Sequence, residues 1–110
     1  MAFTHHVRAD AAGLVVAVVG EMDITVAGAF EEAVQRLISG RHPGLVRIDL
    51  RGLEFLDSTG VSVLVRLWRL ARRENWSLRV INPTGAVRQI LDVTGAMAIV
   101  GGPMAPESVQ

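Results

Sequence analysis

Two hydroxyls and a carboxylate stand together where two apolar runs meet: Asp57, Ser58 and Thr59, followed by Gly60. Such side chains cap the N-terminus of a helix, and a serine hydroxyl can also receive a phosphoryl group. If Ser58 begins a helix, the unpaired N–H groups of the first turn would hold a phosphate. Its charge, about −1.5 to −2, would disturb an adjacent apolar partner surface, and Asp57 would add to the repulsion. From these residues alone, a plain N-cap by Ser58 or Asp57 is the simpler interpretation, and phosphorylation is the alternative.

The rest of the chain lacks the groups that would make this junction an active site. The histidines are His5 and His6, in a predicted edge strand, and His42, in a predicted turn, and none belongs to a catalytic motif. Cysteine is absent, the stretch GVSVL lacks the second glycine of a nucleophile elbow, and no glycine-rich phosphate loop occurs. We therefore predict that the chain is not an enzyme, holds no metal and needs no cofactor of its own.

Length and charge indicate one soluble domain, residues 1–110. Half of the 110 residues are hydrophobic, which suffices for a core without a disulfide or a metal. Eleven basic residues, all arginine, balance eleven acidic ones, so no basic tract favours nucleic acid. The apolar run LVVAVV is far shorter than the roughly 20 residues that span a bilayer, and no signal-peptide core opens the chain. We expect a cytoplasmic protein without membrane insertion.

Hydrophobic periodicity predicts helices that alternate with strands. The predicted order is β-β-α-β-α-β-α-β, which favours an open, mostly parallel sheet of four to five strands covered by helices. Thr25 is the expected N-cap of the first helix, after a loop at residues 21–23, and residues 102–110 are expected to be a frayed tail. Strands are predicted at residues 4–9, 13–20, 45–50, 77–82 and 96–101, and helices at 25–38, 58–75 and 87–94.

The helix that follows the hydroxyl pair has a narrow polar stripe. Its polar residues are spaced four, three and four apart, and nearly all its other side chains are apolar, over an arc of roughly 200°. One interpretation places this helix between the sheet and a neighbouring helix. The other holds that apolar residues beside the stripe are partly exposed and bind a partner. The stripe is Ser62, Arg66, Arg69 and Arg73, and the flanking apolar residues are Val63, Leu67 and Leu70.

Three stretches of the chain resemble the STAS domain family, specifically its single-domain anti-sigma factor antagonists. They are VVAVVGEMDITVAGAFEEAV, with a Gly-Glu-Met-Asp turn, VRIDLRGLEFLDSTGVSVLVRL, with the Asp-Ser-Thr-Gly motif, and LRVINPTGAVRQILDVTGAMAIV. The resemblance covers nearly the whole chain and implies a STAS-type fold. The chain departs from the family in its short C-terminal segment, GGPMAPESVQ, where many relatives have a longer helix. This departure leaves the choice between monomer and dimer open.

The resemblance also implies a partner-switching cycle. The phosphorylated serine of the family corresponds to Ser58, with Thr59 as the secondary candidate, and the acidic turn nearby corresponds to Asp23 with Glu21. The unphosphorylated domain would bind an anti-sigma factor that is also a serine kinase of the histidine-kinase-like ATPase type, which frees a sigma factor for transcription. Phosphorylation would end binding, and a serine phosphatase would reset the cycle.

We expect the partner-binding surface to include both acidic turns and the first turns of the second helix. Its members would be Asp23, Glu21, Asp57, Gly60, Ser62, Val63, Arg66 and Leu67. The alternative function is that of a STAS subunit of an ABC-type lipid transporter, which binds the transporter ATPase and need not be phosphorylated. A third possibility is a STAS signalling module that works without a sigma factor.

Overall fold

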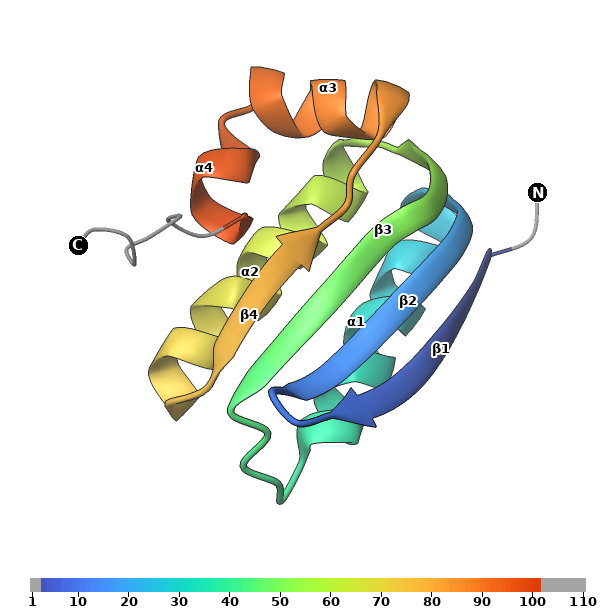
Figure 1. The fold of residues 1–110 in the computed structure, drawn as a ribbon. Coiled ribbons are helices and arrows are strands. Elements are labelled where there is room, and N and C mark those ends of the chain that lie inside the picture. The colour runs from blue at the N-terminus through green and yellow to red at the C-terminus, as the bar shows by residue number, and fades with distance from the viewer. Residues whose placement is uncertain (1–2, 102–110) are drawn as a thin grey trace.

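The computed structural model describes residues 3–101 and has one four-stranded sheet with helices (Figure 1). The strands lie in the order β1-β2-β3-β4; β1 is antiparallel to β2, while β2, β3 and β4 are parallel to one another. The predicted open, mostly parallel sheet is therefore confirmed, with four strands. The elements are β1 (Phe3–Asp10), β2 (Gly13–Met22), α1 (Ile24–Ile38), β3 (Leu45–Leu56), α2 (Ser58–Glu74), β4 (Ser77–Ile81), α3 (Gly85–Val93) and α4 (Ala96–Val100).

Helices α1 and α2 lie side by side on one face of the sheet, behind it in Figure 1, and both begin at the carboxyl ends of the parallel strands. The core fills the space between the sheet and these two helices. Helix α3 crosses the end of β3, and α4 packs against α2 and β4. The most deeply buried side chains include Val16, Val18, Met22, Phe30, Val34, Ile48, Leu64, Leu67 and Leu91.

The last predicted strand, residues 96–101, is wrong, because Ala96–Val100 form helix α4. The apolar run AMAIV has too few residues for the spacing of its apolar side chains to distinguish a strand from a buried helical turn. The preceding corner decides the outcome: Gly95 takes a left-handed conformation with φ 78°, and the chain turns back toward α2. The expectation of a frayed tail at residues 102–110 lies outside the described residues.

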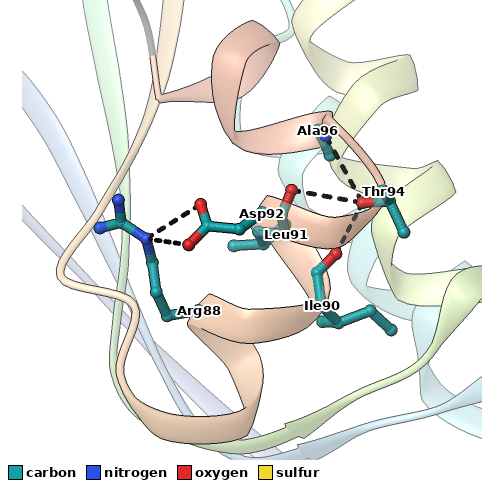
Figure 2. Close-up of polar contacts among 6 residues, drawn as sticks. All are labelled: Arg88, Ile90, Leu91, Asp92, Thr94 and Ala96. Atoms are coloured by element: carbon teal, nitrogen blue, oxygen red, sulfur yellow. Dashed lines mark hydrogen bonds and ion pairs between the residues drawn. The ribbon is translucent and has the colours of Figure 1, made fainter.

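Thr94 connects α3 to α4 at this corner (Figure 2). Its hydroxyl donates to the carbonyl oxygens of Ile90, at 2.7 Å, and Leu91, at 3.3 Å, and accepts from the N–H of Ala96 at 3.4 Å. The hydroxyl thus supplies a further donor to the last carbonyl groups of α3, where the Ile90 oxygen also accepts the backbone N–H of Thr94 at 3.1 Å, and it steers the start of α4. Helix α3 ends at Val93, one residue before its predicted end, and begins at Gly85, two residues before its predicted start.

The boundaries of β2, α1 and β3 at the sheet edge also differ from the sequence prediction. Strand β2 continues to Met22, so Glu21 is part of a strand and not of a loop, and Asp23 rather than Thr25 is the N-cap of α1. Strand β3 continues to Leu56, six residues beyond its predicted end. Because both strands run to the residue before a capping aspartate, the sheet carries these aspartates directly to its carboxyl edge.

Candidate functional site

The two acidic motifs of the sequence meet at the carboxyl edge of the sheet. Met22 is the register partner of Leu56 in the parallel pair β2–β3, so the next residues, Asp23 and Asp57, leave the sheet side by side. The backbone N–H of Asp57 also donates to the carbonyl oxygen of Met22, at 3.4 Å. We call this edge, with Asp23, Ile24, Asp57 and Ser58, the carboxyl rim.

Asp57 caps α2 and leaves the Ser58 hydroxyl free. Its backbone is extended, with φ −104° and ψ −175°, and its side chain accepts from the N–H of Gly60 at 3.0 Å. The choice between Ser58 and Asp57 as N-cap is thereby settled for Asp57. Ser58 is the first helical residue and is exposed, and its hydroxyl has no hydrogen-bond partner among residues 3–101. Thr59, the secondary candidate, is half-buried.

Asp23 has the same role at the start of α1. Its side chain accepts from the Thr25 hydroxyl, at 2.6 Å, and from the Thr25 N–H, at 2.9 Å. These bonds favour the charged form, so the Thr25 hydroxyl, followed by its N–H, lowers the pKa of Asp23 below its usual value. Both rim carboxylates are therefore held in place by the helix N-termini that they cap.

Glu21 does not join the rim carboxylates. Its register partner is Phe55, and the buried neighbours Met22 and Leu56 point to the helix side, so Glu21 lies on the opposite face of the sheet. It is half-buried there, beside a Phe55 side chain that is 44% exposed. Sequence proximity to Asp23 grouped Glu21 with the site, whereas strand alternation separates the two.

Gly60 is required by packing in the first turn of α2. A Cβ atom at this position would stand 2.3 Å from Cδ1 of Leu56 and 3.2 Å from Sδ of Met22. A methyl group at this position would therefore force the side chains of Leu56 and Met22 to move. Gly60 serves the site by close approach of the helix to the sheet.

A family model described as "Mlab, STAS domain" matches residues 5–101. The chain belongs to the STAS domain family. The anti-sigma-B factor antagonist of Bacillus subtilis is 27% identical to it over 84 residues, which make up 76% of this chain and 74% of that protein. These comparisons agree with the resemblance of the three sequence stretches.

Solved structures share the architecture of this STAS domain. An anti-sigma factor antagonist from Mycobacterium paratuberculosis has a TM-score of 0.71 at 29% identity, over 87% of this chain and 80% of that chain. The anti-sigma factor antagonist SpoIIAA in its unphosphorylated form has a TM-score of 0.74 at 18% identity, over 89% of this chain and 83% of that chain. These relatives are named as anti-sigma factor antagonists and not as enzymes, which agrees with the prediction that the STAS domain is not an enzyme.

The prediction of a partly exposed apolar arc beside the arginine stripe of α2 is wrong for Val63 and Leu67 and right for Leu70. Val63 and Leu67 are fully buried, because α2 lies over β3 and β4 with α1 on one side and α4 on the other. Leu70 is half-buried. The interpretation of a wedged helix is thus confirmed, and Val63 and Leu67 belong to the core of the STAS domain rather than to a contact surface.

The polar stripe itself is exposed, as its spacing predicts. Ser62 and Arg66 continue the line of Ser58 along α2 at intervals of one turn. Arg66 donates through Nε and Nη2 to the two carboxylate oxygens of Glu31 on α1, at 3.0 and 2.8 Å. These hydrogen bonds raise the pKa of Arg66 above its usual value. Arg66 therefore ties α1 to α2 at the surface.

Ile24 is a rim residue that sequence reasoning missed. It is the first residue of α1, the position that Ser58 occupies in α2, and 73% of it is exposed. The error in the N-cap hid it, because with Thr25 as N-cap Ile24 falls in a loop. Asp23 was the signal that could have revealed Ile24, since an Asp directly before a helical pattern is a usual N-cap. The residue after such a cap is the first residue of the helix, where few neighbours cover its side chain.

Two negative findings apply to residues 3–101. No helix in this range is both long and apolar enough to cross a membrane. Within the same residues, no three histidine, aspartate or glutamate side chains gather in a way that could hold a metal ion.

Proposed function

We propose that this STAS domain is an anti-sigma factor antagonist controlled by phosphorylation of Ser58. The unphosphorylated domain binds an anti-sigma factor that is also a serine kinase of the histidine-kinase-like ATPase type, and so releases a sigma factor. The kinase modifies Ser58 with its own ATP, which ends binding, and a serine phosphatase restores the hydroxyl. The similarity to anti-sigma factor antagonists from Bacillus subtilis and Mycobacterium paratuberculosis supports this proposal.

The observation that carries the proposal is the division of roles between Asp57 and Ser58. Asp57 makes the capping hydrogen bond, so the exposed Ser58 hydroxyl is not needed for the helix and is accessible to a kinase. A phosphate on Ser58 would lie beside unpaired N–H groups of the first turn of α2, where the helix dipole favours negative charge. The modified domain would therefore stay folded.

The same position explains why modification ends binding. The rim offers a partner the exposed apolar side chain of Ile24 next to the carboxylates of Asp23 and Asp57. A phosphate adds about −1.5 to −2 charges to this surface, which repels carboxylates and disfavours the burial of Ile24. A similar fold accommodates both states in SpoIIAA, with TM-scores of 0.74 for the unphosphorylated and 0.67 for the phosphorylated form.

A phosphorylation assay tests the site. The protein is incubated with candidate anti-sigma kinases and ATP, and the mass shift of one phosphate is followed by mass spectrometry. We expect the shift in wild type and in Ser62→Ala, the exposed serine one turn further along α2, but not in Ser58→Ala. A shift that Ser58→Ala retains and Ser58→Ala/Thr59→Ala loses would move the site to Thr59. A shift retained by both variants would refute the rim as the site.

A binding assay tests the switch. We expect Ser58→Glu to weaken binding to the kinase while its circular dichroism spectrum and melting temperature stay those of wild type. Ile24→Ser, which removes the exposed apolar side chain without adding charge, should weaken binding as well. Wild-type affinity in Ser58→Glu would contradict an electrostatic switch.

A second candidate is a STAS subunit of an ABC-type lipid transporter. The family model that matches the chain is described as "Mlab, STAS domain" and not as an anti-sigma factor antagonist, which keeps this candidate in play. In this case the domain would bind the transporter ATPase, and Ser58→Ala would bind it as well as wild type does. Titrating the domain with a purified ATPase of each class separates the two functions.

A further inference from the structure

A groove runs between α1 and α2 on the outer surface of the helix pair. Two adjoining hollows of about 410 and 520 Å³ form it, and they share Gln35 and Leu70. Because both helices start at the carboxyl rim and run in the same direction, the groove leads away from Ser58 along the arginine stripe. Of the residues that line the groove, only Arg66 belongs to the partner-binding surface expected from the sequence.

The groove carries positive charge that the described residues do not balance. Arg66, Arg69 and Arg73 line its first hollow from α2, over a length of about 10 Å at the helical rise per residue. Arg66 has a carboxylate partner in Glu31. Among residues 3–101, no ion pair reaches Arg69 or Arg73, although both are exposed in the same groove.

The pair Glu31–Arg66 shows what the groove is built to accept. One helical turn after Glu31, α1 presents Gln35, which lines the same hollow as Arg69 and Arg73 but has no charge. A carboxylate beside Gln35 would form the ion pair with Arg69 or Arg73 that the chain itself does not supply. Between the arginines the half-buried Leu70 supplies an apolar floor, which Ile38 and Trp76 continue in the second hollow.

We propose that this groove binds an acidic segment of a partner protein, with carboxylates on Arg69 and Arg73 and an apolar side chain on Leu70. A guanidinium group offers a planar fork that binds a carboxylate through two hydrogen bonds, as Arg66 does with Glu31. Charge complementarity therefore favours carboxylates flanking one apolar side chain. This inference is independent of the modification of Ser58.

Acidic protein fits the groove better than nucleic acid does. Glu31 in the first hollow is already paired with Arg66. Glu74 lines the second hollow together with Arg41, and the chain as a whole has no net charge. A phosphate backbone carries a charge at every nucleotide and would be repelled by the Glu74 carboxylate. A peptide can place neutral side chains there and carboxylates only at Arg69 and Arg73.

The test uses a fluorescein-labelled octapeptide of glutamate and leucine, in which two glutamates flank each leucine, and a control peptide with glutamine for glutamate. We expect the acidic peptide to bind by fluorescence anisotropy, more weakly at high salt, and the control peptide not to bind. Arg69→Gln/Arg73→Gln should weaken binding about tenfold, the sum of two exposed ion pairs. Gln35→Glu should weaken it as well, because it supplies the missing carboxylate from within.

The matched control is Arg8→Gln/Arg51→Gln, which removes the same charge from exposed residues of β1 and β3 and should leave binding unchanged. If both double variants lose the same affinity for the acidic peptide, binding depends on net charge alone and the proposal is overturned. Wild-type binding in Arg69→Gln/Arg73→Gln and Gln35→Glu would also overturn it, with all variants shown to be folded by their melting temperatures. Ser58→Ala should bind the peptide like wild type, so this proposal and the switch can fail separately.

Other occupants of the groove have their own outcomes. A single-stranded oligonucleotide is titrated into the peptide complex as a competitor. If it displaces the peptide at a concentration below the dissociation constant of the peptide, the groove is assigned to nucleic acid and the proposal is overturned. Dimerisation in sedimentation equilibrium that Arg69→Gln/Arg73→Gln abolishes would assign it to a second copy of the chain and overturn it equally.

Discussion

The backbone N–H of Asp57 donates to the carbonyl oxygen of Met22, at 3.4 Å, after the last register pair of the parallel strands β2 and β3. This bond ties the start of α2 to the residue before Asp23, the cap of α1. Two motifs 34 positions apart in sequence thereby share one rim. Four predictions follow from this rim and from the helix behind it.

Removal of the Asp57 side chain should destabilise α2. We expect Asp57→Ala to lower the free energy of unfolding by about 1 kcal/mol, because the N–H of Gly60 loses its acceptor, and Asp57→Asn to retain most of the stability. Urea titration measures both. Thr84, the N-cap of α3, makes no capping hydrogen bond with its side chain, so Thr84→Ala is the control and should cost clearly less. Equal losses at the two caps would contradict the assignment.

Two helical glycines should respond to alanine in opposite ways. Gly60→Ala places a methyl group against Leu56 and Met22 and should cost about 1–3 kcal/mol of unfolding free energy. Gly28→Ala, in the middle of α1, meets nothing within 4 Å and should stabilise the domain by about 0.5–1 kcal/mol. Thermal and urea unfolding report the signs. A neutral Gly60→Ala would mean that the side chains of Leu56 and Met22 rearrange at little cost.

Charge on the buried side of α2 should unfold the domain. Val63→Asp and Leu67→Asp each place a carboxylate in the core without a partner, a cost on the order of 3–5 kcal/mol, which is a large part of the stability of a small domain. Ser62→Asp, on the exposed stripe next to Val63, is the control and should keep the native melting temperature. Circular dichroism melting curves decide the outcome. Folded Val63→Asp and Leu67→Asp proteins would restore the hypothesis of a partner-binding arc.

Acid should weaken the domain partly through Asp23. Since the hydrogen bonds from Thr25 lower the folded-state pKa below the ordinary 3.8, ionised Asp23 stabilises the fold above that pH. The contribution is lost as the pH falls from about 3.8 through the lower folded-state value. Asp23→Asn keeps an acceptor but no charge, so its unfolding free energy should fall less steeply below pH 4. Urea titrations at stepped pH values compare the two, and parallel profiles would show that Asp23 does not contribute.

The periodicity of long segments was sufficient to predict most of the fold. The apolar spacing of α1 and α2 and the β-branched run of β2 predict these elements correctly, because each repeats its period several times. Residues 96–100 offer a single turn, and there the packing of α4 on α2 and β4 overrides the strand-like composition. Strand β3 was predicted too short because the glycine and charges at residues 51–54 resemble a turn.

Some residues of the candidate site were placed correctly from the sequence and others were not. Asp57, Ser58 and Asp23 come together because parallel strands end at one edge, which the order of elements already implies. The burial of Val63 and Leu67 agrees with one of the two interpretations of the sequence, and the choice between them depends on α1 and α4 covering both sides of α2. The opposite placement of Glu21 and Asp23 depends on where β2 ends, and element ends are the least certain part of any sequence prediction.

The capping of α2 by Asp57 rather than by Ser58 has an evolutionary consequence. The side chain of Ser58 makes no hydrogen bond within residues 3–101 and is exposed, so exchanging it would remove the proposed phosphorylation site without a marked change in folding free energy. Under the proposed function, regulation and stability at this rim can therefore be selected independently. A lineage could gain, lose or mimic the proposed modification by a single codon change, while selection for a folded domain acts on its neighbour.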